Sequence, residues 1–267
     1  MRRARLDAEL VRRGLARSRE HAAELIAAGR VTASGRTATK PATAVDPGAP
    51  LLVTADETDE NWASRGAHKL IGALDAFADV EVDGARCLDA GASTGGFTDV
   101  LLRRGAREVV AVDVGYGQLI WRLQNDQRVQ VFDRTNVRRL TPDDIGGRVG
   151  LTVSDLSFIS LTVVLPALIA CTEPAGDLVL MVKPQFEVGK ERLGAGGVVR
   201  SPELRADAVS TVVAAAAGLG RGLAGVQASP LPGPSGNVEY FVHLRADAPT
   251  DADAAQRIEQ AVAEGPQ

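Results

Sequence analysis

Two charged side chains directly follow apolar runs of the sequence. Asp155 closes the segment LTVSD, and Lys183 closes LVLMVK just before Pro184. Lys183 follows six residues of which five are apolar, which is unusual for a lysine unless a carboxylate or a substrate meets it. A lysine in such a position can act as a base. The two residues are therefore candidates for a site that moves a proton.

A second lysine and a second carboxylate extend this set. Arg65, His68 and Lys69 crowd the start of an expected helix, the end at which the helix dipole disfavours cations. An anion or an acid is therefore expected nearby, although three solvated side chains are the plainer interpretation. Glu239 begins the mostly apolar segment VEYFVHL, where its charge could serve a site or simply protect a sheet edge.

The segment LDAGASTGGF, residues 88–97, has the features of a cofactor loop. It follows an expected strand and opens an expected helix, which is where open α/β sheets bind ligands. A dinucleotide fingerprint needs glycine at the position of Ser93, whereas here a carboxylate precedes the first glycine. An acid among small residues suits S-adenosylmethionine, which has an ammonium group and no phosphate. The expected contacts in this loop are Asp89, Gly91, Ser93, Thr94, Gly95, Gly96 and Phe97.

Two more acids end the next two expected strands. Asp113 lies 22 residues after Gly91, where Rossmann-type sites hold ribose hydroxyls. Asp133 ends the following strand and is expected near the adenine. These acids could instead cap loops or helices, but acids at three successive strand ends favour a cofactor site.

Alternating strands and helices must position these residues. After a helix near 67–77, five apolar segments are the expected parallel strands: 87–91, 108–115, 129–133, 151–155 and 177–184. Continuous apolar strands between helices are typical of a parallel sheet covered on both faces. The segments 225–230 and 238–245 are expected to form an antiparallel pair at one sheet edge. In such a sheet Asp155 and Lys183 share one rim with the cofactor loop.

The N-terminal segment carries a charge opposite to that of the remaining chain. Residues 1–40 have a net charge of +6, although the whole chain has −4. A basic end on an acidic body indicates that the end binds a polyanion, and a solvated helix face is the alternative. Residues 1–58 are expected to hold two short helices, ended by Gly14 and Gly29, and then short strands.

The run ELVRRGLARSREHAAELIAAGRVTASGR, residues 9–36, resembles the RNA-binding domain named after ribosomal protein S-four. The resemblance implies that two short helices present basic side chains to RNA. Such phosphate contacts give affinity and positioning rather than sequence recognition. The expected RNA contacts are Arg3, Arg12, Arg13, Arg17, Arg19, Arg30 and, beyond the domain, Arg65.

Four residues described above resemble the K-D-K-E tetrad of FtsJ-like ribose 2'-O-methyltransferases: Lys69, Asp155, Lys183 and Glu239. Their contexts D-L-S-F, V-K-P-Q-F-E and N-V-E-Y-F match. With the N-terminal domain, nearly the whole chain is similar to the TlyA/hemolysin-A family of bacterial rRNA methyltransferases. The resemblance implies S-adenosylmethionine as cofactor, no metal, and ribosomal RNA as partner, with cytidines of both ribosomal subunits as targets.

The same resemblance assigns roles to the tetrad. Lys183 would act as the base or stabilise the developing alkoxide. Asp155 and Glu239 would orient the lysines, and Lys69 would add positive potential. The target nucleotide would be extruded from its stack, but aromatic residues make up only 4% of the chain, which leaves open what stacks on it. The Gly-rich segment 187–202 is expected to close over RNA or cofactor, or to be a plain connection.

The expected architecture is α/β, a Rossmann-like S-adenosylmethionine-dependent methyltransferase fold with a mostly parallel seven-stranded sheet, preceded by a small α+β RNA-binding domain. Trp62 is expected to pack one domain on the other. The expected boundaries are 1–58 for the RNA-binding domain, 59–64 for the linker, 65–250 for the methyltransferase domain and 251–267 for a C-terminal tail.

Several other classes are less consistent with the sequence. The cysteines Cys87 and Cys171 have no metal-site spacing and are expected to be buried thiols. No apolar run approaches the ~18 residues of a membrane span, and no secretory signal is recognisable, so a cytoplasmic protein without a membrane partner is expected. The oligomeric state is not indicated. The alternatives are a non-catalytic RNA-binding or ribosome assembly factor, a membrane-acting hemolysin and an NAD-dependent enzyme.

Overall fold

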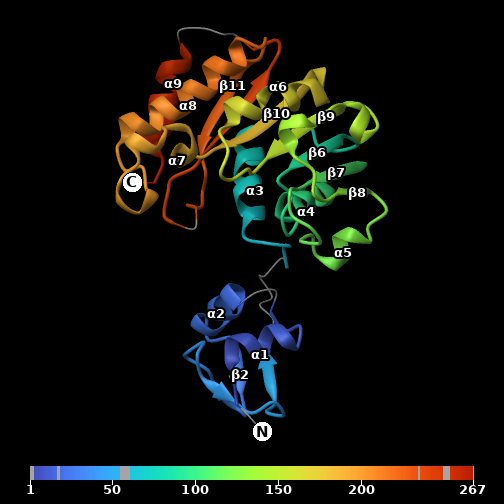
Figure 1. Ribbon diagram of the computed structural model, residues 1–267, viewed down its shortest axis with the longest axis vertical. Helices are drawn as coiled ribbons and strands as arrows, with labels where there is room; N and C mark the ends of the chain where they lie inside the picture. Colours follow the sequence, from blue (N-terminus) through green and yellow to red (C-terminus); the bar gives the residue numbers. More distant parts are fainter. Residues whose placement is uncertain (1–2, 17–18, 55–60, 234, 249–252, 267) are drawn as a thin grey trace. The chain divides into compact units, whose positions relative to one another are not determined.

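The computed structural model describes residues 3–16, 19–54, 61–233, 235–248 and 253–266. The chain divides into two compact units, Met1–Asn61 and Trp62–Gln267 (Figure 1). Each unit has a hydrophobic core of its own.

The first unit combines two short helices with short strands. Its helices are α1 (Leu6–Arg12) and α2 (Arg19–Ala27), and its strands are β1 (Ala4–Arg5), β2 (Val31–Ala33), β3 (Arg36–Thr37), β4 (Ala44–Val45) and β5 (Leu51–Val53). Strands β3, β2 and β5 form one sheet, while β1 pairs with β4. Leu6 and Leu10 of α1 pack against Ile26 and Val31. Gly14 has a φ of +70° just after the first helix, a conformation that few other residues adopt at low cost. The expected small α+β domain is therefore confirmed.

The second unit contains a seven-stranded sheet in the order β11-β12-β10-β9-β6-β7-β8. Its strands are β6 (Arg86–Ala90), β7 (Glu108–Val112), β8 (Val129–Phe132), β9 (Val149–Ser154), β10 (Thr172–Val182), β11 (Gly222–Ala228) and β12 (Tyr240–Arg245). Five neighbouring strands, β10, β9, β6, β7 and β8, run parallel to one another. Strand β12 is antiparallel to both of its neighbours, β10 and β11. The expected mostly parallel sheet, with an antiparallel pair at one side, is confirmed.

Helices cover both faces of this sheet. They are α3 (Gly66–Ala76), α4 (Gly96–Arg103), α5 (Trp121–Gln124), α6 (Leu161–Cys171), α7 (Pro184–Glu187), α8 (Pro202–Ala217) and α9 (Asp253–Glu264). Short 3-10 turns lie at Val137–Arg139, Asp143–Ile145, Lys190–Arg192 and Ala195–Gly197. One core joins the sheet to α3 and α4, and the other joins it to α6, α8 and α9.

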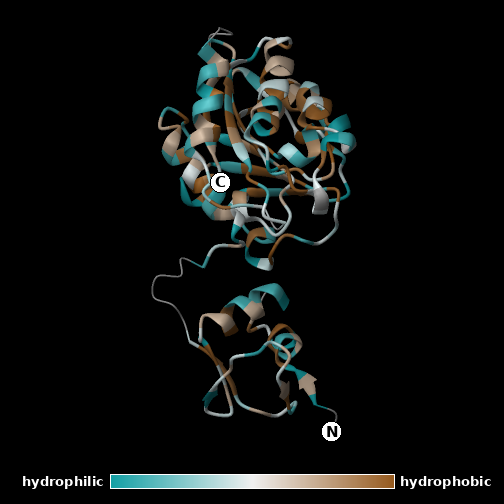
Figure 2. Cartoon of the chain, turned by 90° about the vertical axis from the view of Figure 1, so that its left-hand side faces the viewer, coloured by the Kyte–Doolittle hydropathy of each residue, from teal (hydrophilic) through white to brown (hydrophobic). Residues whose placement is uncertain are grey.

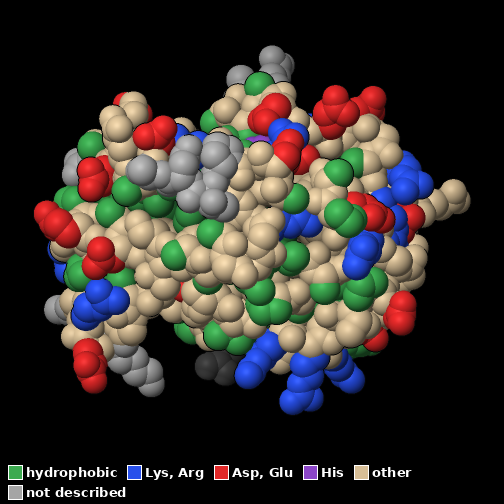
Figure 3. Space-filling model, turned by 90° about the horizontal axis from the view of Figure 1, so that it is seen from above, with side chains coloured by type: hydrophobic (Ala, Val, Ile, Leu, Met, Phe, Trp, Pro, Cys, Tyr) green, Lys and Arg blue, Asp and Glu red, His purple; other side chains and the backbone are tan. Residues whose placement is uncertain are grey.

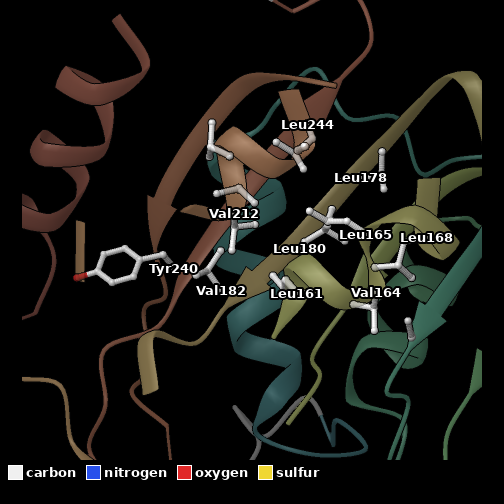
Figure 4. Packing of buried hydrophobic residues seen from close by; sticks show 14 of the residues in the cluster. Leu161, Val164, Leu165, Leu168, Leu178, Leu180, Val182, Val212, Tyr240 and Leu244 are labelled. Atoms are coloured by element: carbon white, nitrogen blue, oxygen red, sulfur yellow. The ribbon is translucent and has the colours of Figure 1, made fainter. Parts of the chain in front are cut away.

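Consecutive residues of β12 show how both faces are buried. Tyr240 belongs to the core under α6 and α8, whereas Phe241 belongs to the core under α3 and α4. Figure 4 shows the first of these cores, where Leu165 of α6 and Val212 of α8 lie beside Leu180 of β10. Figure 2 shows the hydrophobic colour along strands of the sheet and both colours on the helices that cover it. The sheet is therefore buried on both faces, and the loops at its rim start from this core.

Three boundaries differ from the sequence-based expectation. Strand β10 begins at Thr172 rather than near residue 177, and a register shift separates its first residue from Asp177. The first five residues of the strand, TEPAG at 172–176, have no apolar pattern, so hydrophobic periodicity does not predict them as part of a strand. The expected tail at 251–267 instead holds α9, whose Ile258 and Val262 are buried against the sheet. Helix α9 is thus part of the domain core.

The third difference concerns the expected linker at 59–64. The Ala63 N–H donates to the carboxylate of Asp99 over 2.9 Å, and the Arg103 guanidinium lies 4.0 Å from the centre of the Trp62 ring. Residues 62 and 63 are therefore anchored on α4 within the second unit. Trp62 packs on an arginine of its own unit, and its packing between the two domains stays a prediction.

The surface and the cysteines agree with a globular chain. Figure 3 shows acidic side chains spread over the face that it displays rather than gathered in one patch.

Both cysteines are buried and free, and burial raises the pKa of the Cys171 thiol to about 11. Among the residues that the structure describes, no helix has the length and apolar character needed to cross a membrane.

Candidate active site

The carboxyl ends of β9 and β10 bring Asp155 and Lys183 together. The two strands are parallel neighbours in which Leu180 pairs with Ser154, so the residues that follow them emerge at one rim. The Nζ atom of Lys183 lies 2.5 Å from Asp155 Oδ1. Lys183 is 7% exposed, and an ion pair at this depth is screened much less than one in open solvent.

Lys69 and Glu239 form a second ion pair, although 170 positions separate them in the sequence. Lys69 Nζ donates to Glu239 Oε2 over 2.6 Å, and both side chains are buried. The pairing of Val182 with Tyr240 places Glu239 beside Lys183 at the same rim. Because β12 lies inside the sheet, between β11 and β10, the interpretation of Glu239 as edge protection is wrong.

Both pairs retain capacity for a further contact. Lys183 Nζ also donates to Ser157 Oγ over 2.9 Å. An ammonium group has three donors, so these two contacts leave one for a substrate oxygen. On the other pair, Glu239 Oε1 is buried and has no hydrogen-bond partner among the described residues. The rim therefore offers one donor and one acceptor side by side.

A pocket of about 420 Å³ opens beside this rim. Gly91 and Ser93 line it from the loop after β6, Asp113 from the end of β7, and Asp155 from the end of β9. A side chain at Gly91 would come within 2.7 Å of the Asp155 backbone oxygen, and Gly91 has a φ of +92°. Glycine is therefore required where the two loops meet.

The acid at the end of β7 organises the pocket loops. Asp113 accepts hydrogen bonds from the backbone N–H of Ser93, over 2.8 Å, and of Gly115, over 2.7 Å. Asp133, at the end of β8, accepts one from Gly117 over 2.9 Å but does not line the pocket. Asp113 and Asp133 thus shape loops, and a ligand contact is supported by the pocket only for Asp113.

Other residues of the expected cofactor loop act behind the pocket. Phe97 packs against Phe241, with ring centres 6.0 Å apart. Gly95 is the N-cap of α4 with a φ of +100°, and a side chain there would meet Leu119 and Leu123. The predicted residues that do not line the pocket are Asp89, Thr94, Gly95, Gly96, Phe97 and Asp133.

Asp89 is the most deeply buried acid of this region. It is 0% exposed, and its Oδ2 accepts a hydrogen bond from Thr98 Oγ1 over 2.7 Å. Its Oδ1 is buried and has no hydrogen-bond partner in the part of the chain that the structure describes. Burial above all raises the Asp89 pKa to about 7, and the nearby charges of Asp155 and Asp113 act in the same direction. An unpaired carboxylate oxygen is a suitable acceptor for a cationic ligand group.

Sequence reasoning missed much of the pocket wall. Phe158 lines it with a φ of +64° and 91% of its surface exposed. No spacing rule marks such residues, although several directly follow the acids that were recognised. The unpredicted lining residues are Val112, Val114, Gln118, Asn136, Val137, Leu156, Ser157, Phe158, Ile159 and Val164.

The Gly-rich segment 187–202 is held by hydrogen bonds and packing near the rim. Asn237 Oδ1 accepts from the Val199 N–H over 2.9 Å, and its Nδ2 donates to the Gly197 oxygen over 3.0 Å. Val188 and Val199 pack against Ala208 of α8. The segment is thus held two residues before Glu239, and its closure over a ligand stays a prediction.

The arginines expected to bind RNA have different environments in the first unit. Arg12 and Arg19 pair with Glu9 and Asp7, over 2.6 and 3.0 Å, but stay more than half exposed. Arg3 pairs with Asp46 on the surface, and Arg30 donates to the Thr54 oxygen. For these residues and for Arg65 an RNA contact stays a prediction, and Arg17 lies outside the described residues.

Arg13 differs from the other arginines because its guanidinium is used inside the unit. It donates to Glu9 Oε1 and to the backbone oxygens of Ala49 and Pro47, each over 2.7 Å. Only 22% of its side chain is exposed. Arg13 therefore stabilises the turn before β5 and has little of its guanidinium left for a phosphate.

Comparison with known proteins gives the pocket and the two ion pairs a context. Residues 62–246 match the model of the FtsJ-like methyltransferases, and residues 4–51 match that of the S4 domain. The chain belongs to the FtsJ-like methyltransferase family. It is therefore a methyltransferase, and the domain that precedes its catalytic domain is an S4 domain.

Individual relatives agree with this FtsJ-like assignment. The chain is 61% identical to the 16S/23S rRNA (cytidine-2'-O)-methyltransferase TlyA of Mycobacterium tuberculosis over 99% of each chain. It is 33% identical to Hemolysin A of Brachyspira hyodysenteriae, over 90% of this chain and 99% of the relative. A solved structure from Streptococcus thermophilus, described as a hemolysin, superposes with a TM-score of 0.76 at 37% identity, covering 99% of this chain and 97% of the other. The FtsJ-like fold and the TlyA/hemolysin-A relationship are confirmed.

Proposed function

We propose that this protein transfers a methyl group from S-adenosylmethionine to the ribose 2'-hydroxyl of cytidines in ribosomal RNA. The observation that carries the proposal is the meeting of two lysine–carboxylate pairs, Lys183–Asp155 and Lys69–Glu239, at one rim of the sheet beside a pocket. The name of the Mycobacterium tuberculosis relative states the same reaction. The S4 domain supports RNA as the substrate. Because ribosomal RNA is found in the cytoplasm, we place the protein there as well.

The residues in and behind the pocket fit this methyl donor. Asp89 lies behind the pocket, and its unpaired oxygen supplies negative charge for an ammonium group. Asp113 lines the pocket where ribose hydroxyls are held in this class of fold. Gly91 and Ser93 leave room for the ligand. The bound cofactor supplies the electrophilic methyl group. The protein residues bind it, orient it and exclude water from it.

Lys183 stabilises the charge that develops in the proposed reaction. A ribose hydroxyl is a poor nucleophile and must lose its proton as it attacks. The remaining N–H of Lys183 donates to that oxygen and stabilises the negative charge on it, while the hydroxyl proton passes to the unpaired Glu239 Oε1. Asp155 and Ser157 fix the direction of the ammonium group, so little reorganisation is needed when the substrate binds.

The Lys69–Glu239 pair supports the Lys183–Asp155 pair through its buried charges. Lys69 contributes a buried positive charge at the rim, and Glu239 holds it in place through its Oε2. The free Oε1 of Glu239 is available to accept a hydrogen bond from a substrate hydroxyl or from Lys183. Removal of either partner would leave an uncompensated buried charge.

The test is methyl transfer from radiolabelled S-adenosylmethionine to ribosomal RNA, with the modified nucleotide identified by mass spectrometry. We expect Lys183→Ala to lower the rate at least 100-fold while cofactor binding persists. Arg104→Ala is the control, because Arg104 pairs with the exposed Asp75 at the surface. Undiminished transfer by Lys183→Ala, or a methyl group on a base atom instead of the ribose, would overturn the proposal.

A further inference from the structure

Two segments of the catalytic rim are joined at more than the ion pair. One segment, residues 155–161, follows β9 and leads into α6, and the other, residues 183–187, follows β10 and forms α7. We propose that Glu187 is a positioning residue for methyl transfer, which clamps these segments so that Asp155 and Lys183 stay aligned. This inference rests on the proposed function and adds a residue to its machinery.

The carboxylate of Glu187 binds the start of α6 with both oxygens. Its Oε1 accepts the backbone N–H of Leu161 over 2.8 Å, and its Oε2 accepts the hydroxyl of Ser160 over 2.5 Å. Ser160 is itself the N-cap of α6 and accepts from the Thr162 N–H over 3.2 Å. Glu187 therefore serves a helix end that it does not belong to, 26 residues away in the sequence.

Further contacts cross between the same segments. At the near end, Lys183 pairs with Asp155 and donates to Ser157 Oγ. In the middle, the rings of Phe158 and Phe186 lie with their centres 5.2 Å apart. The Glu187 contact closes the far end, so each segment is fixed at three successive points. Of the three, only the Glu187 contact binds backbone, which makes it the one that sets the path of the loop.

The chemistry of the site explains why a carboxylate stands here. The first N–H groups of a helix lack partners within the helix, and a negative charge at this end is favoured by the helix dipole. Glu187 is partly buried, and burial raises its pKa, while the hydrogen bonds from Ser160 and Leu161 act against that rise. A surface capping residue would not need such an enclosed position.

The clamp acts on the cofactor pocket as well as on the lysine. Asp155, Leu156, Ser157, Phe158 and Ile159 all line the pocket, and the clamp fixes the residue that follows them. Without Glu187 this wall would be held at one end by an ion pair and an aromatic contact. The geometry of the reacting groups should then loosen while the RNA-binding surface of the S4 domain is unchanged.

The experiment compares Glu187→Ala, Glu187→Gln and Ser160→Ala in the full-length protein, by steady-state methyl transfer and by calorimetric titration of S-adenosylmethionine. Glu203→Ala is the matched control, since Glu203 accepts from Ser201 over 2.5 Å at the exposed start of α8. A displacement of about 1 Å costs up to 100-fold in rate. We therefore expect Glu187→Ala to lower kcat roughly tenfold or more, with the KM for RNA within about twofold of wild type.

The conservative variants separate positioning from folding. Glu187→Gln keeps an oxygen for the Leu161 N–H and an amide that can donate to Ser160, so kcat should recover to within roughly threefold of wild type. Ser160→Ala removes one of the two bonds and should give an intermediate rate. The calorimetric stoichiometry should stay at one site per chain in every variant.

Several outcomes would overturn the inference. A Glu187→Ala protein with wild-type kcat would do so, as would a Gln variant as slow as the Ala variant. A loss of kcat matched by an equal loss of cofactor-binding stoichiometry would show a folding role only, and if the Ala variant does not fold, the Gln and Ser160 variants decide. An inactive wild type would instead overturn the proposed function, and the positioning role with it.

Discussion

The buried Asp89 allows a quantitative prediction about stability and binding together. Burial holds its pKa at about 7, against an ordinary value of 3.8. Between these values the folded chain binds a proton that the unfolded chain releases, so the free energy of unfolding falls as the pH rises from about 4 to about 7. Three units at 1.36 kcal/mol each give a loss of about 4 kcal/mol, which is complete above that window.

The change Asp89→Asn should remove this loss. The amide oxygen still accepts from Thr98, but its N–H₂ takes the place of an oxygen that has no donor beside it, which costs about 1 kcal/mol or more. By pH 4.5 wild type has already lost about 1 kcal/mol of this stability, because the ordinary pKa of 3.8 lies below that pH. We therefore expect the variant to be about as stable as wild type at pH 4.5 and about 3 kcal/mol more stable at pH 8. The two stability curves should diverge between these values.

Urea unfolding at pH 4.5, 6 and 8 measures this difference directly. Asp143→Asn, at an exposed aspartate, is the control that should follow wild type at every pH. At pH 8 the same Asp89 variant should bind S-adenosylmethionine roughly tenfold more weakly or worse, because a charged hydrogen-bond partner contributes about 1.5–3 kcal/mol. A stability difference that does not grow with pH, or a variant with unchanged cofactor affinity, would refute this reasoning.

Three further outcomes follow from the geometry. Lys69→Met should destabilise the second unit by about 3–5 kcal/mol, because it leaves the buried carboxylate of Glu239 without a counter-charge. In thermal unfolding, adding Glu239→Leu should restore part of that lost stability. Gly91→Ala should weaken cofactor binding in calorimetry by at least tenfold, since the new methyl group would meet a backbone oxygen at 2.7 Å. Arg13→Ala should unfold the S4 domain at lower urea concentration, because Arg13 also holds the backbone oxygens of Ala49 and Pro47. Arg12→Ala should cost less stability, because Glu9 keeps its contact with Arg13, and it should reduce the salt dependence of RNA binding by about one ion.

Some parts of this structure could be predicted because one pattern determined them. The strand that ends at Val112 contains four successive apolar residues, and the one that ends at Ser154 has apolar residues at every second position; hydrophobic periodicity finds such segments. The charges that follow them stand out for the same reason. The sequence therefore predicts Asp155 and Lys183 at one rim, and in the structure Lys183 Nζ lies 2.5 Å from Asp155 Oδ1.

Other parts depend on contacts that leave no local trace. Glu187 looks like an ordinary helix-end acid until its distant partner Ser160 is known. Trp62 sits in a polar stretch, and only the position of Arg103 shows where it packs. Phe158 lines the pocket through a left-handed backbone conformation, which no residue-type preference would assign to phenylalanine. Tertiary geometry, rather than propensity, decides all three.

The reversed direction of β12 has a consequence for how the enzyme comes into being. Glu239 enters the rim from the last strand of the sheet, while its partner Lys69 lies near the start of the same domain. A growing chain that has not yet supplied this strand has Lys69 without its counter-charge and no strand between β11 and β10. Incompletely synthesised chains should therefore have no methyltransferase activity. Activity should appear only when β12 has been inserted into the sheet.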